Sequence, residues 1–239
     1  ICSFDAQLDA LAQSRSVVLH IRSDQKVFCA GADLKEVSAR MRASDGANRM
    51  YAYVAGIQRL YARIERLPQV TVAEIGGAAM GGGLELALAS DLRIAANEAK
   101  LGLPEVRLGL IPGAGGTQRL TRVCNAAVAK RLILGAEIFD GASAEKLGVV
   151  HWAVPRADLA QRAAEIVGGI TSLPAEALAA SKACIAAAGN SDRSGYTDEL
   201  EFTRLLFNKT DTRQRVEEFL VGAGGASVHA VGQEHVRLR

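Results

Sequence analysis

Three consecutive glycines and a nearby glutamate are the residues of this chain best suited to do chemistry. Gly81, Gly82 and Gly83 lead into a helical pattern, LELALA, whose first turn contains Glu85. Glycine lets the backbone approach a ligand closely, and the first amides of a helix are unpaired and partly positive. Such a segment can donate N–H groups to a developing oxyanion and hold a carboxylate beside it. The structural alternative is a glycine-lined turn that packs a helix tightly on a strand.

Composition excludes several other classes of function. The chain has 239 residues and a formal net charge of +2, enough length to bury a core without disulfides. Its basic residues are scattered and aromatic residues make up only 5% of the chain, so we expect no nucleic-acid partner. Short, interrupted apolar stretches predict no membrane span. Four distant cysteines without ligand spacing indicate a reducing compartment and no metal site.

Apolar spacing predicts that strands alternate with helices up to about Val154 and that helices alone follow. This pattern indicates an α/β core with an all-helical C-terminal region. The predicted strands cover residues 17–22, 70–75, 92–95, 99–103 and 149–155. The predicted helices cover 4–12, 34–37, 50–66, 84–89 and 143–147, with one that the glycine- and proline-rich segment 108–120 leads into and four more after Ala157. Residues 40–48 are polar and predict a mobile loop.

Three segments resemble signature blocks of the crotonase superfamily, which contains enoyl-coenzyme A hydratases and isomerases. They are FCAGADLKE (28–36), GGGLELALASDLRIA (81–95) and LGLPEVRLGLIPGAGGTQRL (101–120), in the order and at about the spacing of that family. The first two are especially similar to the methylglutaconyl-coenzyme A hydratase branch.

The resemblance implies an α/β fold, a spiral of repeated strand–strand–helix turns, with a C-terminal helical region that forms homotrimers or homohexamers. We therefore expect a catalytic core over residues 1–155, a helical region over 156–221 and a tail over 222–239 that is a candidate for disorder. A bacterial cytoplasm or a mitochondrial matrix is the implied compartment.

The resemblance also implies an active site that acts on an acyl-coenzyme A thioester, with no metal and no redox cofactor. The backbone amides of Ala32 and Gly82 would form the oxyanion hole, and Glu85 and Glu105 would be the catalytic acid–base pair. Two carboxyl groups that share one water cannot comfortably both ionise, so one can donate a proton while the other accepts. Taken singly, each glutamate has a structural alternative, Glu85 at a helix N-terminus and Glu105 as the cap of a turn.

Further residues match the substrate-lining segments of the family. The expected substrate-binding residues are Ala30, Gly31, Asp33, Leu34, Lys35, Gly81, Pro112 and Gly113. Of these, Asp33 also suits a structural role, and Lys35 has a solvated alternative. We expect the segment from Gly113 to Gly116 to form a pocket wall, since it lacks the ending of a P-loop. His20, His151 and Cys29 are predicted to be core residues.

Two parts of the sequence depart from the family pattern. The family begins with a strand and a loop that holds the adenine end of coenzyme A, and neither stands before Ile1, so we expect a natural segment to precede Ile1 and name no adenine-binding residue. After Leu220 the usual E-K-R is replaced by VGAGGASVHAVGQEH. A lysine that would approach the coenzyme is therefore missing.

The predicted function is hydration of 2-enoyl-coenzyme A, by syn addition of water across the conjugated double bond. The alternatives are double-bond isomerisation or another reaction through the same enolate site, and an inactive scaffold. RNA binding, reported in the methylglutaconyl branch, is disfavoured because the first helix, FDAQLDALAQS, contains no lysine. Acyl-chain preference is not readable from the sequence.

Overall fold

The computed structural model describes residues 2–188 and 194–223. The chain divides into two compact units, Ile1–Ala183 and Cys184–Arg239. The predicted division into a core over 1–155 and a helical region over 156–221 stays a prediction. Residues 224–239, most of the predicted tail, lie outside the described residues.

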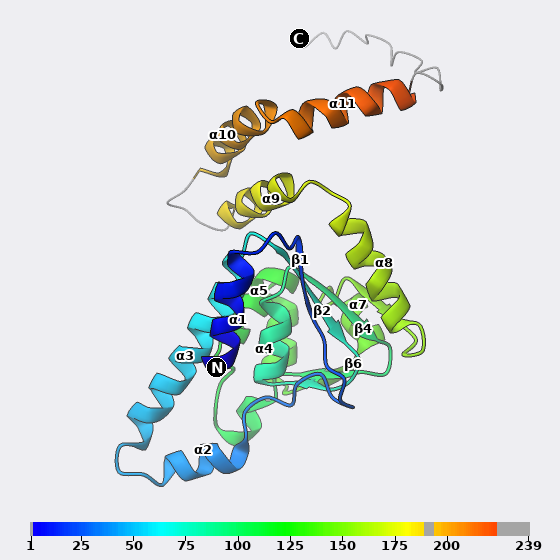
Figure 1. Cartoon of the computed structure of the whole chain (residues 1–239). Coiled ribbons are helices and arrows are strands. Elements are labelled where there is room, and N and C mark those ends of the chain that lie inside the picture. The colour runs from blue at the N-terminus through cyan, green and yellow to red at the C-terminus, as the bar shows by residue number, and fades with distance from the viewer. Residues whose placement is uncertain (1, 189–193, 224–239) are drawn as a thin grey trace, which may run out of the picture. The chain divides into compact units, whose positions relative to one another are not determined.

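The larger sheet of the first unit has four parallel strands. In spatial order they are β1 (Val18–Ile21), β2 (Val70–Ile75), β4 (Leu92–Ala96) and β7 (Trp152–Val154) (Figure 1). The central strands β2 and β4 are almost wholly buried, as expected for a parallel sheet that is covered on both faces. Helix α8 (Leu159–Thr171) packs against β1, β2 and β4 and buries Leu159 and Ala163.

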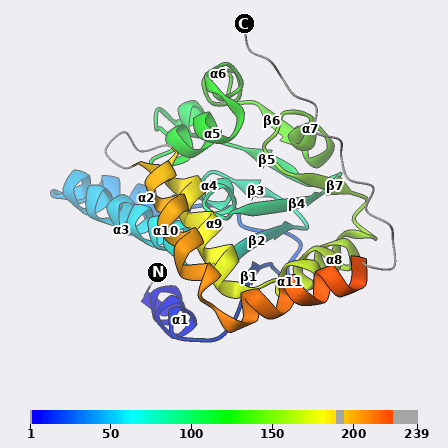
Figure 2. The same ribbon diagram turned by 90° about the horizontal axis from the view of Figure 1, so that it is seen from above.

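A smaller sheet contains three short strands. They are β3 (Ala79–Met80), β5 (Lys100–Gly102) and β6 (Ile138–Asp140), with β3 parallel to β5 and β6 antiparallel to it (Figure 2). Helix α4 (Gly82–Leu88) begins two residues after β3 ends at Met80 and packs against α5 (Gly116–Cys124). The first unit also contains η1 (Glu105–Leu108), α6 (Ala126–Leu134) and α7 (Gly141–Lys146).

Three helices come from the N-terminal part of the chain: α1 (Cys2–Ala12), α2 (Leu34–Met41) and α3 (Gly46–Arg66). Helices α1 and α3 lie side by side, and Arg63 of α3 forms ion pairs with Asp5 and Asp9 of α1 (Figure 1). The inward face of α3 buries Leu60, Tyr61 and Ile64. These residues form a second core cluster with Leu8, Leu67, Ala89 and Ala114.

A polar cluster joins helix α9 (Ala175–Ala187) to the larger sheet. The Lys182 ammonium lies 2.7 Å from Asp91 Oδ2 and donates to the Gln69 carbonyl at 2.9 Å. Asp91 Oδ2 in turn accepts hydrogen bonds from the amide and the hydroxyl of Thr71.

The second unit contains α10 (Gly195–Phe207) and α11 (Thr210–Ala223). Among the described helices, none is long and apolar enough to cross a membrane.

Most predicted elements are confirmed, including the strand 70–75 and the helix that ends at Arg66. The prediction of a loop over 40–48 is wrong at both ends, because α2 continues to Met41 and α3 begins at Gly46. The predicted final strand is too long, since only Trp152–Val154 pairs with β4. Helix α6 and strands β3 and β6 were not predicted. Both strands have only two or three residues, too few for periodicity to identify.

Candidate functional site

Two loops of the site lie side by side because a short parallel pairing aligns them. Cys29 pairs with Ala79 in a parallel bridge, and the Met80 amide donates to the Cys29 carbonyl at 3.0 Å. Ala32 and Gly82 each follow this pair by the same number of residues. A Cβ atom built on Gly31 would lie only 3.2 Å from the Gly82 nitrogen, so the two segments are in contact there. Within the described residues, neither the Ala32 amide nor the Gly82 amide donates a hydrogen bond to protein.

The backbone conformation of Gly81 favours glycine. Its backbone has φ 53° and ψ −123°, a conformation that a side chain strongly disfavours. A Cβ atom at this position would also lie 2.9 Å from Glu105 Oε1. The absence of a side chain at this turn leaves room for the Glu105 carboxyl group beside it.

The Glu85 side chain is buried in the first turn of α4 and is 3% exposed. Its Oε1 accepts a 2.8 Å hydrogen bond from the amide of Gly116, the first residue of α5. The pKa of Glu85 is raised to about 7, mainly by burial and in smaller part by the negative charge of Glu105, while the Gly116 hydrogen bond acts in the opposite direction. At neutral pH this carboxyl group can therefore either donate or accept a proton.

Glu105 lies at the start of η1, and its carboxyl group approaches the same glycine turn from another element. Burial raises its pKa above the ordinary value. Its Oε2 is buried and has no hydrogen-bond partner among the described residues. A buried carboxyl oxygen of this kind is costly unless a ligand or water binds it. The turn at Gly81 and Gly82 is thus flanked by two carboxyl groups that both favour protonation.

The other predicted site residues are divided between this turn and the surface. Ala30, Ala32, Asp33, Leu34 and Lys35 are exposed around the start of α2, and Leu34 is 57% exposed. Asp33 caps α2, because its side chain accepts from the Lys35 amide at 2.8 Å.

The segment before α5 lies against helix α3. Pro112 is buried, and a Cβ atom built on Gly113 would lie 3.0 Å from the Val54 side chain. The Gly113 carbonyl accepts a 2.5 Å hydrogen bond from the Gln58 side chain. The loop that carries Gly113 and Gly116 is therefore held at both of these positions.

The prediction that both histidines are core residues is wrong for His151 and only partly matched by His20. His20 is half-buried and its Nε2 lies 2.9 Å from Glu74 Oε2. His151 is exposed, and its Nδ1 accepts from the Arg93 amide at 3.1 Å. Each lies at or beside an end of a short outer strand of the sheet, where one side stays open to solvent. Cys29 is half-buried beside the glycine turn, so it only partly matches the prediction of a core thiol.

Three residues that contact the site were missed from the sequence: Tyr61, Gln58 and Arg119. The Tyr61 hydroxyl donates to the Gly82 carbonyl at 2.8 Å. Arg119 is buried, donates to the Ala114 carbonyl and pairs with Glu65 at 2.6 Å. The available signal was a tyrosine at a buried helical position, whose hydroxyl group must find a partner.

A comparison with family models assigns nearly the whole chain. The model described as enoyl-CoA hydratase/isomerase matches residues 5–221. The chain belongs to the enoyl-CoA hydratase/isomerase family. The crotonase-type fold expected from the signature blocks is confirmed by a solved structure, an enoyl-CoA hydratase from Bacillus anthracis. That structure aligns with a TM-score of 0.85 at 33% identity and covers 92% of this chain and 84% of the other.

Curated relatives in the family are similar over a shorter stretch. The mitochondrial methylglutaconyl-CoA hydratase of Rattus norvegicus is 47% identical over 145 residues, 60% of this chain and 44% of that protein. The mitochondrial enoyl-CoA hydratase domain-containing protein 2 of Bos taurus is 49% identical over 152 residues, 62% of this chain and 50% of that protein. The matched part thus spans about half the length of these relatives.

Proposed function

We propose that this member of the family hydrates 2-enoyl-coenzyme A thioesters. The proposal rests mainly on one observation: Glu85 and Glu105, from two separate elements, flank a single glycine turn, and burial raises the pKa of both. Members of the family that only move a double bond commonly manage with one such position. A pair of carboxyl groups favours addition of water.

In the proposed reaction the thioester oxygen lies between the amides of Ala32 and Gly82. A water molecule between the two carboxyl groups gives a proton to one glutamate as its oxygen bonds to the β-carbon. The π electrons move toward the carbonyl and form an enolate, which the two amides stabilise. The α-carbon then takes a proton from the other glutamate. We treat the two carboxyl groups as a coupled pair, without fixing which one is the acid.

The proposal includes neither a metal nor a redox cofactor, because the two amides and two carboxyl groups supply the charge stabilisation and proton transfer that hydration needs. Turnover is therefore expected to be unchanged after dialysis against a chelator. A loss of activity that added metal restores would contradict this part of the proposal. We also propose that copies of this chain assemble into homotrimers or homohexamers. Sedimentation velocity measures the mass of the assembly.

The direct test is a steady-state assay with crotonyl-coenzyme A that follows loss of the conjugated absorbance. Glu105→Gln keeps the size of the side chain and removes its proton transfer. We expect kcat to fall by roughly 100- to 10,000-fold, the usual contribution of a general acid or base. The melting temperature should hardly change, since Glu105 Oε2 has no partner to lose among the described residues.

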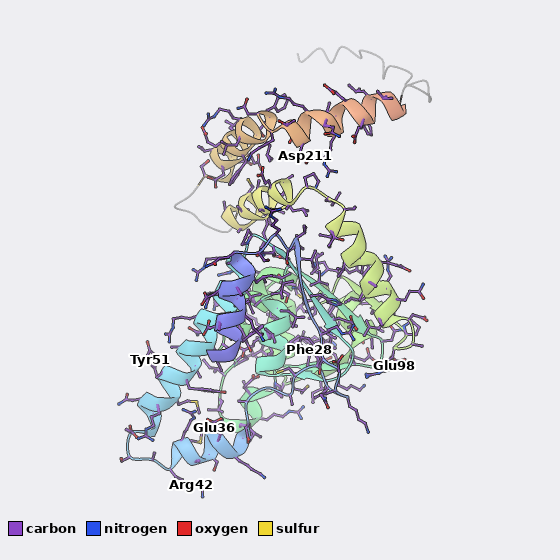
Figure 3. All side chains as sticks on the ribbon, in the orientation of Figure 1. Phe28, Glu36, Arg42, Tyr51, Glu98 and Asp211 are labelled. Carbon is purple, nitrogen blue, oxygen red and sulfur yellow. The ribbon has the colours of Figure 1, made fainter. Side chains whose placement is uncertain are left out.

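Glu98→Gln is the matched control, because Glu98 is exposed in the loop between β4 and β5 and lies on neither of the elements that carry Glu85 and Glu105 (Figure 3). Its turnover should equal that of the wild type. Parallel losses of activity and stability in Glu105→Gln would assign Glu105 a structural role. Conversion of a 3-enoyl thioester without hydration of crotonyl-coenzyme A would favour an isomerase.

A further inference from the structure

The strongest unassigned contact near the site comes from helix α3, which supplies none of the expected catalytic groups. The Tyr61 hydroxyl donates a 2.8 Å hydrogen bond to the carbonyl oxygen of Gly82. Tyr61 is 8% exposed and packs in the cluster of Leu60, Ile64 and Ala114. We propose that Tyr61 is a positioning residue that fixes the direction of the Gly82 amide for the thioester oxygen. This inference rests on the proposed function.

The glycine turn has no side chains that restrict its backbone, so hydrogen bonds must hold it, among them the 2.9 Å bond from the Gly81 amide to the Gly102 carbonyl. Gly81 adopts φ 53° without a side chain, and Gly82 and Gly83 follow it, so three successive residues lack the Cβ atoms that limit rotation. On one side of the Gly82 nitrogen, the Gly81 carbonyl accepts from the Glu85 amide at 3.0 Å. On the other side, the Gly82 carbonyl accepts from Tyr61. Together the two bonds hold residue 82 from both ends.

The surroundings of Gly82 show how closely Tyr61 approaches it. A Cβ atom built on Gly82 would lie 3.7 Å from Gly31 Cα and 3.9 Å from both Glu85 Oε2 and the Tyr61 hydroxyl oxygen. The tyrosine hydroxyl therefore reaches the point where the oxyanion segment and the Glu85 carboxyl group meet. A shift of the Gly82 carbonyl would turn residue 82 about its Cα and so move its amide relative to both groups.

Tyr61 also remains a hydrogen-bond donor throughout the working pH range. Burial raises its pKa well above the ordinary value, and the neighbouring Cys29 and Glu85 add to the effect. Arg119, whose guanidinium carbon lies 6.0 Å from the centre of the Tyr61 ring, acts in the opposite direction but does not cancel it. The hydroxyl group cannot ionise at neutral pH and so keeps its proton for Gly82.

The same face of α3 restrains the rest of the site. Gln58, one turn before Tyr61, donates to the Gly113 carbonyl, and Glu65, one turn after it, pairs with Arg119, which donates to the Ala114 carbonyl. Residues spaced by three or four positions share a helix face. This polar stripe of α3 thus contacts the oxyanion turn and the loop that leads to the Gly116 amide. The contacts of Gln58 and Glu65 with this loop support a positioning role for the whole face of α3 that includes Tyr61.

The variant Tyr61→Phe removes only the hydroxyl group. Misplacing a reacting group by about 1 Å can cost roughly 100-fold, so we expect kcat to fall by about 10- to 100-fold while KM changes less than about twofold. Tyr51→Phe is the matched control on the same helix, because Tyr51 is 78% exposed (Figure 3). Its kcat should equal that of the wild type.

A spectroscopic readout separates positioning from a general loss of structure. The infrared stretch of an isotope-labelled thioester carbonyl is recorded for a saturated acyl-coenzyme A bound to each variant. Hydrogen bonds from the oxyanion amides lower this frequency, and Tyr61→Phe should return it part of the way toward the free ligand. Only bound ligand contributes to the shifted band, so a partly unfolded sample does not imitate the result.

Two outcomes would overturn the inference in distinguishable ways. A wild-type frequency that is lowered by binding and is unchanged in Tyr61→Phe, with kcat within twofold, rejects the role of Tyr61 and leaves the proposed function intact. A wild-type frequency equal to that of the free ligand rejects the oxyanion hole, and with it both proposals.

Discussion

Glu85 combines burial with very little neutralising charge. Its Oε1 accepts from the Gly116 amide, and the nearby Arg119 guanidinium is engaged by Glu65 and by the Ala114 carbonyl. Desolvation therefore outweighs the interactions that favour the carboxylate, and the pKa of Glu85 rises to about 7. A carboxyl group of this kind exchanges a proton near neutral pH, as a shared acid–base role requires.

The same pKa makes a prediction for stability. The folded protein favours protonated Glu85, so protonation of this group stabilises the fold. This contribution to the free energy of unfolding is complete below the ordinary pKa of 4.5 and is lost as the pH rises through about 7. Glu85→Gln does not ionise. Its free energy of unfolding relative to wild type should therefore rise by roughly 3 kcal/mol between pH 4 and pH 8.

Urea denaturation at a series of pH values measures this difference. Glu98→Gln, on an exposed loop, should follow the wild type at every pH. If the difference between Glu85→Gln and wild type does not vary with pH, Glu85 does not have the raised pKa on which the shared role depends.

Single residues were predictable from the sequence where the chemistry depends on a local pattern. The glycines before a helix and the glutamate in its first turn indicated an oxyanion site. The donation from Gly116 to Glu85 was not predicted, because it joins residues that are far apart in the sequence. Gly115 and Gly116 before a helix were the available signal, but the missing P-loop ending favoured only a pocket wall.

At the scale of elements, helix α4 lies unusually close to the segment that ends in the oxyanion loop. A Cβ atom built on Gly83 would lie 2.1 Å from the Cys29 carbonyl oxygen and 2.8 Å from Cys29 Cβ. At its other end, the buried Arg93 donates to the carbonyl of Ala87, in the last turn of α4, at 3.5 Å and to that of Ser90, just beyond the helix, at 2.6 Å. The helix that presents Glu85 is thus fixed at both ends by packing and hydrogen bonds.

Gly83→Ala should therefore destabilise the fold by about 3 kcal/mol, the upper part of the usual range for overpacking a core. The backbone of Cys29 must move to admit the methyl group. Gly168→Ala in α8 is the matched control, since nothing lies within 4 Å of its Cβ position. That substitution should stabilise the helix by roughly 0.5–1 kcal/mol.

Thermal and urea unfolding of both variants measure the two effects. Equal stabilities for Gly83→Ala and wild type would contradict the close packing of α4.

Long apolar strands and helices were predictable because their periodicity extends over several residues, as in β2 and α3. Strands β3 and β6 were not, because their pairing depends on partners elsewhere in the chain.

At the scale of the whole molecule, the alternation of strands and helices predicted an α/β core but not the order of the strands. The order β1-β2-β4-β7 and the separate small sheet depend on contacts between distant segments. The signature blocks supplied the fold, and the alignment with the Bacillus anthracis structure confirmed it. The pairing of Cys29 with Ala79 explains why the first two blocks must lie together in space.

Turnover of crotonyl-coenzyme A in water labelled with heavy oxygen, followed by mass spectrometry of the product, shows whether the two carboxyl groups activate water. If the two carboxyl groups activate water beside the oxyanion amides, the wild type will place one labelled oxygen on the β-carbon. Glu85→Gln and Glu105→Gln will do so at least roughly 100-fold more slowly. A wild type that binds the thioester but incorporates no label, or variants that match its rate, would show that the two carboxyl groups do not activate water.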